Sequence, residues 1–340
     1  WMDPNGDGDP ADGIDGWRLD VANEVPIGFW KEWHAHARKI NPDCYTVAEY
    51  WDNARQFLDE GAFSATMNYH GFAFPVKGFL IDEVLPPSGF SRELDTRRNG
   101  HSRPVQYAVQ NLMDSHDTDR LASMIVNAGR SAYQQADRYD YDTNVSPRYV
   151  PDYQVRKPND TERRIERLIV LLQMTYVGPP MIYYGTEAGM WGADDPCDRM
   201  PMVWPEFTYD PQQTDPNGKP RPADPVVFDE KLFDFFRAAI ALRTASSALR
   251  RGDIKFLTTD DQAQFLSLQR SDNVETLLIG LNRGDDAYRW KISLEDNQTV
   301  EQIFTASGEV SQFKVDAKHN AATVTVPPLD GVVLRVSAKE

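Results

Sequence analysis

Residues 16–24 read Gly-Trp-Arg-Leu-Asp-Val-Ala-Asn-Glu, a short apolar run that ends in acidic residues. The apolar residues of the next segment, 27–40, recur at helical spacing, and a second apolar run, 44–48, ends just before Glu49. A strand, a helix and a second strand in this order are typical of a βαβ unit, whose two strands lie parallel. The stretch from residue 16 to residue 49 therefore predicts a parallel α/β sheet.

The same alternation continues along the chain. We expect further strands at 63–67, 109–113 and 180–184 and further helices near 53–59, 119–127, 161–175 and 228–242. Segments 128–160 and 191–227 are rich in Pro, Asp, Tyr and Arg, and they are too long for simple connections. We expect both segments to be loops that help to form a binding site.

After residue 249 the pattern changes to short strands separated by turn residues. These expected strands are 265–269, 276–281, 288–292, 299–303, 322–326 and 332–336. The sequence thus predicts two domains, an α/β domain over 1–249 and a small antiparallel β-sandwich domain over 250–340.

The chain is acidic. Among its 340 residues, 36 Lys and Arg face 52 Asp and Glu, which gives a formal net charge of −16. Nucleic acids and anionic membrane surfaces attract clustered basic residues, so we expect neither as a partner. The longest apolar stretch, 168–184, is interrupted by Gly178, Pro179 and Pro180, and we expect no membrane span.

Three acidic residues, Asp20, Glu49 and Asp117, stand at the ends of three apolar runs. Asp20 and Glu49 are 29 positions apart, about one βαβ unit, so their carboxylates would emerge at the same rim of a parallel barrel. A retaining glycosidase needs two carboxyl groups about 5–5.5 Å apart. Spacing alone leaves a second interpretation open, in which the acids only cap strand ends and helix starts.

Four blocks of the sequence, taken in order, resemble conserved blocks of the α-amylase family of glycoside hydrolases. They are 16–24, Ala48-Glu49-Tyr50-Trp51, 111–118 (Asn-Leu-Met-Asp-Ser-His-Asp-Thr) and 178–187 (Gly-Pro-Pro-Met-Ile-Tyr-Tyr-Gly-Thr-Glu). The last block is similar to the eighth barrel strand of the family, and the all-β tail is similar to its C-terminal domain. The Val-Ala-Asn-Glu end of the first block resembles the neopullulanase, cyclomaltodextrinase and maltogenic amylase branch.

The resemblance implies a retaining hydrolase of α-1,4-glucosidic bonds in starch-like α-glucans, maltooligosaccharides, cyclodextrins or pullulan. Asp20 would be the nucleophile that forms a covalent glucosyl ester, and Arg18 would keep its carboxylate ionised and oriented. Glu49 would act first as general acid and then as base, which requires a raised pKa. Asp117 would stabilise the transition state, with His116 as a neighbouring ligand of sugar hydroxyls. Further substrate-binding residues implied by the resemblance are Glu24, Trp51, Asp195 and Arg199. No organic cofactor is expected.

The chain departs from the family in one large respect. The family barrel has eight strands, whereas five are expected here, beginning with the one that resembles the fourth. The family's first conserved block ends in Asn-His, a dipeptide that does not occur in this sequence. We therefore expect the chain to hold about strands 4–8 of a TIM (β/α)8 barrel. A complementary N-terminal segment or chain would supply strands 1–3.

A candidate metal site lies near the start of the chain. Asp3, Asn5, Asp7 and Asp9 place oxygen side chains at alternate positions, with a glycine where an EF-hand loop turns sharply. The twelfth position, a bidentate Glu in an EF-hand, is Ile14 here. A Ca²⁺ loop and an acidic surface turn both fit this pattern, and mutual repulsion of the packed oxygens favours Ca²⁺.

Two further interpretations of function remain open. The first is a catalytically silent relative of the amylases that binds sugar or serves as a subunit scaffold. Such relatives usually lack one of the three acids, and here all three are present. The second is an enzyme of another branch, a plain α-amylase, an α-glucosidase or a transglycosylase, because these share the same acids.

Overall fold

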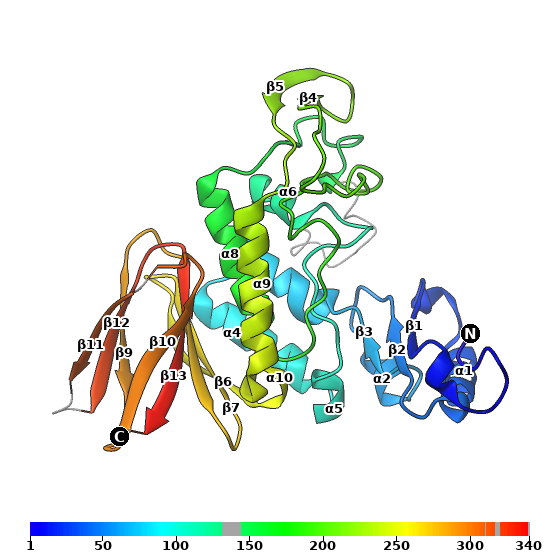
Figure 1. Cartoon of the computed structure of the whole chain (residues 1–340), viewed down its shortest axis with the longest axis horizontal. Helices are drawn as coiled ribbons and strands as arrows, with labels where there is room; N and C mark the ends of the chain where they lie inside the picture. Colours follow the sequence, from blue (N-terminus) through cyan, green and yellow to red (C-terminus); the bar gives the residue numbers. More distant parts are fainter. Residues whose placement is uncertain (131–143, 310, 317–319, 339–340) are drawn as a thin grey trace.

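The computed structural model of the chain describes residues 1–130, 144–309, 311–316 and 320–338. Of the predicted loop 128–160, the part 131–143 lies outside the described residues. Three regions follow one another across the molecule (Figure 1): a small parallel sheet at the N-terminus, a helical middle, and a β sandwich at the C-terminus.

The parallel sheet has the strand order β1-β2-β3, with β1 at Gly16–Leu19, β2 at Tyr45–Ala48 and β3 at Ala65–Thr66. Gly16 pairs with Tyr45, and Leu19 pairs with Ala48, so β1 and β2 end at the same level. A Cβ atom at Gly16 would lie 2.0 Å from the Tyr45 carbonyl oxygen, so only glycine allows this close approach. The predicted βαβ unit is confirmed.

Two isolated parallel bridges extend the sheet beyond β3. Met67 is bridged to Gln110, and Asn111 is bridged to Pro180. The expected strands 109–113 and 180–184 are thus reduced to single bridges. Pro179 and Pro180 have no N–H, so this segment offers few donors for a longer ladder. Among the described residues β1 pairs only with β2, which leaves its other edge open.

Helices connect and cover these segments. The α-helices are α1 (Ile27–Ile40), α2 (Arg55–Asp59), α3 (Phe74–Val76), α4 (Pro87–Asn99), α5 (Arg103–Gln106), α6 (Leu121–Val126), α8 (Asp160–Thr175), α9 (Glu230–Ala245) and α10 (Ser247–Arg251). Short 3-10 turns, η1 (Pro10–Asp12) and η2 (Ala22–Glu24), lie near the N-terminus, and two π-helical turns, η3 (Tyr69–Ala73) and η4 (Lys77–Ile81), flank α3. In the described part of the chain, no helix is both long and apolar enough to cross a membrane.

Local signals explain which helices were predicted. α1 has the predicted bounds because its apolar residues recur at helical spacing, and α8 begins with a capping box between Asn159 and Glu162. α4 was not predicted; Pro87 occupies its first helical turn, where the missing N–H costs nothing.

The C-terminal sandwich has a five-stranded sheet, β10-β13-β8-β7-β6, and a three-stranded sheet, β11-β12-β9. The strands are β6 (Asp253–Asp260), β7 (Phe265–Ser271), β8 (Thr276–Asn282), β9 (Tyr288–Ser293), β10 (Gln298–Thr305), β11 (Gln312–Asp316), β12 (Ala321–Val326) and β13 (Asp330–Ala338). β6 and β11, both edge strands, were not predicted. β6 alternates half-buried with exposed residues, as an edge strand does, so it lacks the apolar run of the central strands.

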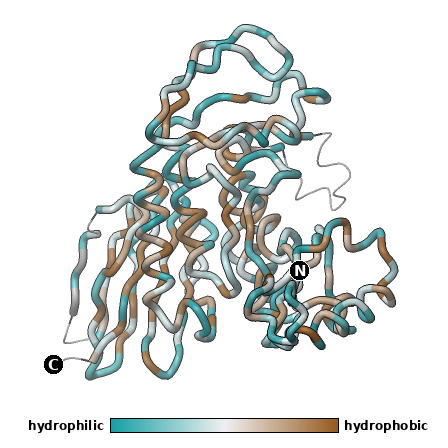
Figure 2. The backbone as a smooth tube through the Cα atoms, turned by 45° about the vertical axis from the view of Figure 1, so that its right-hand side comes forward, coloured by the Kyte–Doolittle hydropathy of each residue, from teal (hydrophilic) through white to brown (hydrophobic). Residues whose placement is uncertain are grey.

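The sandwich and the helical middle share a hydrophobic core. Leu168 and Leu171 of α8 pack beside Gly331 of β13, and one apolar cluster includes residues of α8, α9, β7 and β8. Figure 2 shows hydrophobic segments running through these central helices and the adjoining strands. The predicted boundary between residues 249 and 250 falls within α10, shortly before β6 begins, and the shared core continues across it, so the division into two domains stays a prediction.

The predicted loop 191–227 contains a short hairpin, β4 (Gln212–Thr214) with β5 (Pro220–Asp224). It lies at the top of Figure 1, above α8 and α9. The loop follows the bridge at Pro180 in the chain, so it lies beyond the carboxyl end of the last parallel segment.

Candidate active site

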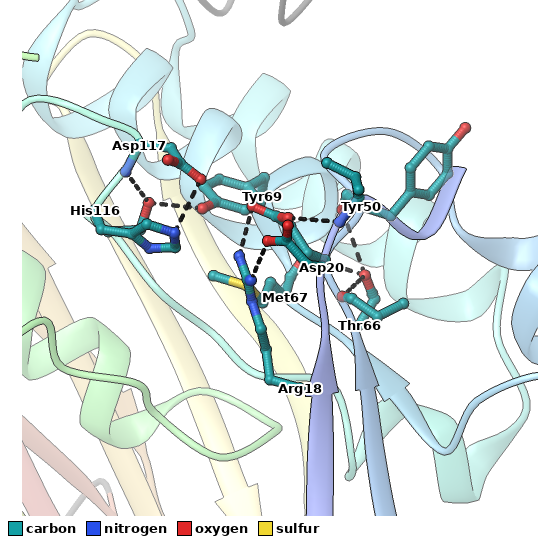
Figure 3. A network of polar contacts seen from close by, with 12 residues as sticks. Arg18, Asp20, Tyr50, Thr66, Met67, Tyr69, His116 and Asp117 are labelled. Carbon is teal, nitrogen blue, oxygen red and sulfur yellow. Dashed lines mark hydrogen bonds and ion pairs between the residues drawn. The ribbon is translucent and has the colours of Figure 1, made fainter. Parts of the chain in front are cut away.

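The three predicted acids follow three parallel segments of one sheet, β1, β2 and, beyond β3, the segment at Asn111. Asp20 comes directly after β1, Glu49 directly after β2, and Asp117 lies six residues after the bridge at Asn111. Because the carboxyl ends of parallel strands share one edge, the three side chains emerge on the same side of the sheet. In Figure 3, Arg18, Asp20, His116 and Asp117 point toward a common centre, whereas the ring of Tyr50 points away from it.

Arg18 joins two of the acids. Its Nη1 atom donates a hydrogen bond to Asp20 Oδ1 at 2.5 Å, and its Nη2 atom lies 2.7 Å from Glu49 Oε1. Arg18 and Asp20 share a strand face because side chains two positions apart point the same way. One guanidinium group therefore contacts both carboxyl groups and fixes their positions relative to each other.

Glu49 is the buried member of the group, with 5% of its surface exposed. Burial raises the pKa of Glu49 to about 7, and the neighbouring Asp117 carboxyl adds to the increase. The Val21 amide opposes it by donating to Glu49 Oε2 at 2.8 Å. Val21 has a φ of 42°, a strained conformation for a β-branched residue, and this conformation belongs to the turn that brings its N–H to Glu49.

Asp20 has the opposite character. Its side chain is largely exposed, and the hydrogen bond from Arg18 lowers its pKa. A hydrogen bond with Glu49 also lowers the pKa of Asp20, so the two carboxyl groups lie within hydrogen-bonding reach of each other. Asp20 is therefore ionised at neutral pH, whereas Glu49 keeps its proton up to about pH 7, an arrangement typical of an acid and nucleophile pair.

His116 and Asp117 close the site on the other side. His116 Nε2 lies 3.3 Å from Asp117 Oδ2. Within the described residues, one group of three metal-ligating side chains (His, Cys, Asp or Glu) has all its ligand atoms within 4.8 Å of one another. It consists of Glu49, His116 and Asp117. Such a group could hold a metal ion, but Glu49 already contacts Arg18 and Val21, and its raised pKa disfavours the ionised form that a metal requires.

The predicted pair Asp195 and Arg199 reaches the same place from the last loop. Arg199 lies 2.6 Å from Asp195 Oδ1 and 3.2 Å from Asp117 Oδ1, and it donates to the His116 carbonyl oxygen at 3.0 Å. The structure thus brings both residues to the rim, where Arg199 links the last loop to Asp117.

Tyr69 and Ser115 were not predicted. The Tyr69 hydroxyl donates to Ser115 Oγ at 2.8 Å, and the same Oγ atom accepts the Asp117 amide at 3.1 Å. Tyr69 is fully buried, so its hydrogen bond fixes the loop that carries His116 and Asp117. Its place just after β3, at the same sheet edge as the acids, is the signal that could have identified it.

Trp51 and Glu24, the other two predicted substrate-binding residues, contact neighbours of their own. The Trp51 ring stacks on Tyr69 with 4.3 Å between ring centroids, and only 8% of the residue is exposed. Glu24 belongs to η2, and its carboxylate accepts from Asn23 at 2.8 Å. Trp51 thus supports Tyr69 from the core, and substrate contact by either residue stays a prediction.

The N-terminal acidic loop folds as a series of turns. Asp3 accepts the Gly6 and Gly8 amides, Asn5 accepts the Asp7 amide, and Asp7 accepts the Asp9 amide, at 2.8–3.1 Å. Asp9 caps η1 through the Ala11 amide. These bonds satisfy the side-chain oxygens within the loop. They account for the acidic pattern without a cation, and Ca²⁺ binding stays a prediction.

The chain matches the family model for "Alpha amylase, catalytic domain" over residues 10–141. A cyclomaltodextrinase from a Bacillus species is 33% identical over 270 residues, which is 79% of this chain and 39% of that relative. Neopullulanase 2 from Thermoactinomyces vulgaris is 29% identical over 322 residues, or 95% of this chain and 45% of that one. A solved structure of a cyclomaltodextrinase aligns with a TM-score of 0.69 and 29% identity, over 96% of this chain and 46% of that one.

This chain spans less than half the length of each of these relatives. The similarity nevertheless covers most of the chain, including the four sequence blocks and the C-terminal sandwich. It supports the fold of the family, a TIM barrel followed by a β domain. The predicted family is confirmed: the chain belongs to the α-amylase family of glycoside hydrolases, and its relatives include cyclomaltodextrinases, neopullulanases and maltogenic amylases.

Proposed function

We propose that this chain carries the catalytic acids of a retaining glycoside hydrolase that cleaves α-1,4-glucosidic bonds in α-glucans. One observation supports the proposal most directly: Arg18 holds Asp20 and Glu49 together while their pKa values shift in opposite directions. An ionised carboxylate beside a protonated carboxyl group is what the first step of a double displacement requires.

In that first step, the Asp20 carboxylate attacks the anomeric carbon of the sugar. A bond forms between Asp20 and this carbon while the bond from the carbon to the glycosidic oxygen breaks. Glu49 gives its proton to that oxygen, and the shortened glucan leaves as an alcohol. The product on the protein is a covalent glucosyl ester of Asp20.

In the second step, Glu49 acts as a base. It takes a proton from water as the water oxygen bonds to the anomeric carbon, and the bond from that carbon to Asp20 breaks. Arg18 stabilises the departing Asp20 carboxylate through its short hydrogen bond. Asp117 and His116 hold sugar hydroxyls and stabilise the positive charge of the transition state.

The substrate class follows from the relatives. They are named as enzymes of cyclic maltodextrins and pullulan and as a maltogenic amylase. We infer that starch-like α-glucans, maltooligosaccharides, cyclodextrins and pullulan are the substrates to test on this protein.

We further propose that the sheet is completed at β1 by a segment that supplies barrel strands 1–3, so that the described sheet corresponds to about strands 4–8. The open edge of β1 supports this, because every strand of a closed barrel pairs on both sides. The exposed apolar side chains of Ile14 and Val21 lie at the two ends of this strand. Residues 1–340 alone should be inactive and should gain α-glucan hydrolysis when the completing segment is supplied. Full activity of residues 1–340 alone would contradict this partner.

The experiment that tests the catalytic proposal is Asp20→Asn in the complete enzyme. The amide is nearly isosteric but cannot attack carbon, so we expect hydrolysis of maltoheptaose to fall at least ~10³-fold with an unchanged circular dichroism spectrum. Asp43→Asn, at another exposed aspartate, should leave activity unchanged. Turnover of Asp20→Asn close to that of the wild type would refute the nucleophile. A wild type that binds maltoheptaose without cleaving it would favour the silent sugar-binding module.

A further inference from the structure

A cavity of about 280 Å³ lies within the last loop, away from the three acids. Its walls come from the segment 189–203 and from the excursion 209–227 that carries the β4–β5 hairpin. The residues that line it are mainly apolar and include Met190, Trp191, Met200, Val203 and Val227. Neither the sequence blocks nor the catalytic arrangement assigns a role to this cavity.

The backbone of the last loop links the cavity to the candidate active site. Met200 lines it and directly follows Arg199, which contacts both Asp117 and Asp195. The Tyr184 hydroxyl donates to the Met200 carbonyl oxygen at 2.7 Å and so ties this point of the loop to the end of the last parallel segment. The cavity wall thus includes a residue one position beyond a side chain that contacts Asp117.

Two polar side chains stand among the apolar walls, Asp210 and Gln212. Gln212 Oε1 accepts from Trp191 Nε1 at 3.0 Å and from Arg221 Nη2 at 2.9 Å. These bonds fix the amide group, and no hydrogen bond described for the chain uses its nitrogen, which can therefore donate to a ligand. The Asp210 carboxylate supplies an acceptor.

Exposed aromatic side chains adjoin the cavity. Trp204 is 50% exposed and Phe207 is 61% exposed, and the Tyr209 hydroxyl accepts the Trp204 amide at 2.7 Å. Large aromatic side chains exposed close together on a surface often mark a ligand site. A pyranose ring has an apolar face of C–H groups and a rim of hydroxyls, so aromatic walls with one carboxylate and one amide suit it chemically.

We propose that this cavity binds a glucosyl unit of the α-glucan beyond the units held at the catalytic acids, so that the enzyme favours longer maltooligosaccharides. The volume is near the lower end of the range of ligand pockets, about 300–1,000 Å³, which suits a single sugar unit more than a long segment of chain. The inference rests on the proposed α-glucan hydrolysis, and it names an additional point of contact with the same substrate.

The test fills the cavity without touching the acids. Val227→Trp places a large side chain at a half-exposed wall position, and Val274→Trp makes the same change on an exposed turn of the β sandwich. In the complete enzyme we expect Val227→Trp to lower kcat/KM for maltoheptaose at least fivefold relative to maltotriose, and Val274→Trp to leave this ratio unchanged. Asp210→Ala, which removes the acceptor, should lower the ratio in the same direction and serves if Val227→Trp fails to fold.

A second readout separates this inference from the proposed function. In the Asp20→Asn background, calorimetry should detect maltoheptaose binding that weakens at least fivefold on Val227→Trp, whether or not catalysis occurs. Equal kcat/KM ratios together with equal maltoheptaose affinities in wild-type and cavity variants would overturn the sugar site. A wild type that binds maltoheptaose through this cavity but cleaves neither substrate would refute the proposed hydrolase and leave the sugar site supported.

Discussion

The buried carboxyl group of Glu49 makes a prediction about stability that needs no substrate. The pKa of Glu49 is raised from 4.5 to about 7 in the folded protein, chiefly because the residue is buried. A group whose pKa is raised by folding binds its proton more tightly in the folded state, so it stabilises the fold below pH 4.5. That contribution is lost as the pH rises through 7.

The size of the effect follows from the shift. One pKa unit corresponds to about 1.4 kcal/mol, so Glu49 should lower the free energy of unfolding by up to about 3 kcal/mol between pH 4.5 and pH 8. Arg18 and the Val21 amide contact the Glu49 carboxylate, so they already reduce the loss of stability that its ionisation causes. Glu49→Gln keeps the shape of the side chain and does not ionise, so its free energy of unfolding should not show this decrease with rising pH.

The assay is urea denaturation of the wild type and of Glu49→Gln from pH 5 to pH 8. We expect the variant to gain stability relative to the wild type as the pH rises, with most of the gain between pH 5 and pH 7 and little further gain above pH 7. Glu32→Gln, on the exposed face of α1, is the control and should follow the wild type at every pH. Parallel pH dependences for the wild type and Glu49→Gln would refute the raised pKa and, with it, the case for Glu49 as the acid.

Three further predictions address activity, metal binding and the backbone. In the complete enzyme, kcat/KM for maltoheptaose should fall about tenfold per pH unit above pH 7, because Glu49 must be protonated. On the acid side, kcat/KM should fall only below pH 3.8, where Asp20 protonates. A profile that is flat to pH 9 would contradict these roles. Calorimetric titration should detect weak Ca²⁺ binding that Asp3→Ala abolishes, and no Ca²⁺-dependent heat in the wild type would remove the metal site. Gly178→Ala should cost about 1–3 kcal/mol of stability in urea denaturation, because Gly178 has a φ of +97° and a Cβ atom would lie 2.7 Å from the Val109 carbonyl oxygen. Gly28→Ala, in α1 with nothing within 4 Å of the new atom, is its control and should be neutral or stabilising, and an equal effect of the two changes would contradict the strain.

Elements set by local signals were predicted well. The apolar spacing of α1 and the start of α8 depend on residues within a few positions of one another. The strand expected at 109–113 depends instead on partners distant in sequence, and it pairs only through Gln110 and Asn111. Periodicity shows which side chains are apolar, but it does not show how many hydrogen bonds a partner segment can offer.

The order of the motifs in the sequence was enough to predict that Asp20, Glu49 and Asp117 share one edge of a parallel sheet. Each acid follows a strand, and the carboxyl ends of parallel strands lie at the same edge. Only the tertiary structure decided how these acids differ. Arg18 reaches Asp20 and Glu49 at once, and burial of Glu49 under a turn whose Val21 amide it accepts raises its pKa, while Asp20 stays open to solvent. The cavity of the last loop likewise exists only when residues 189–203 meet residues 209–227. Electrostatic environment and cavity shape depend on contacts between residues far apart in the chain, and the linear pattern of residue types does not contain them.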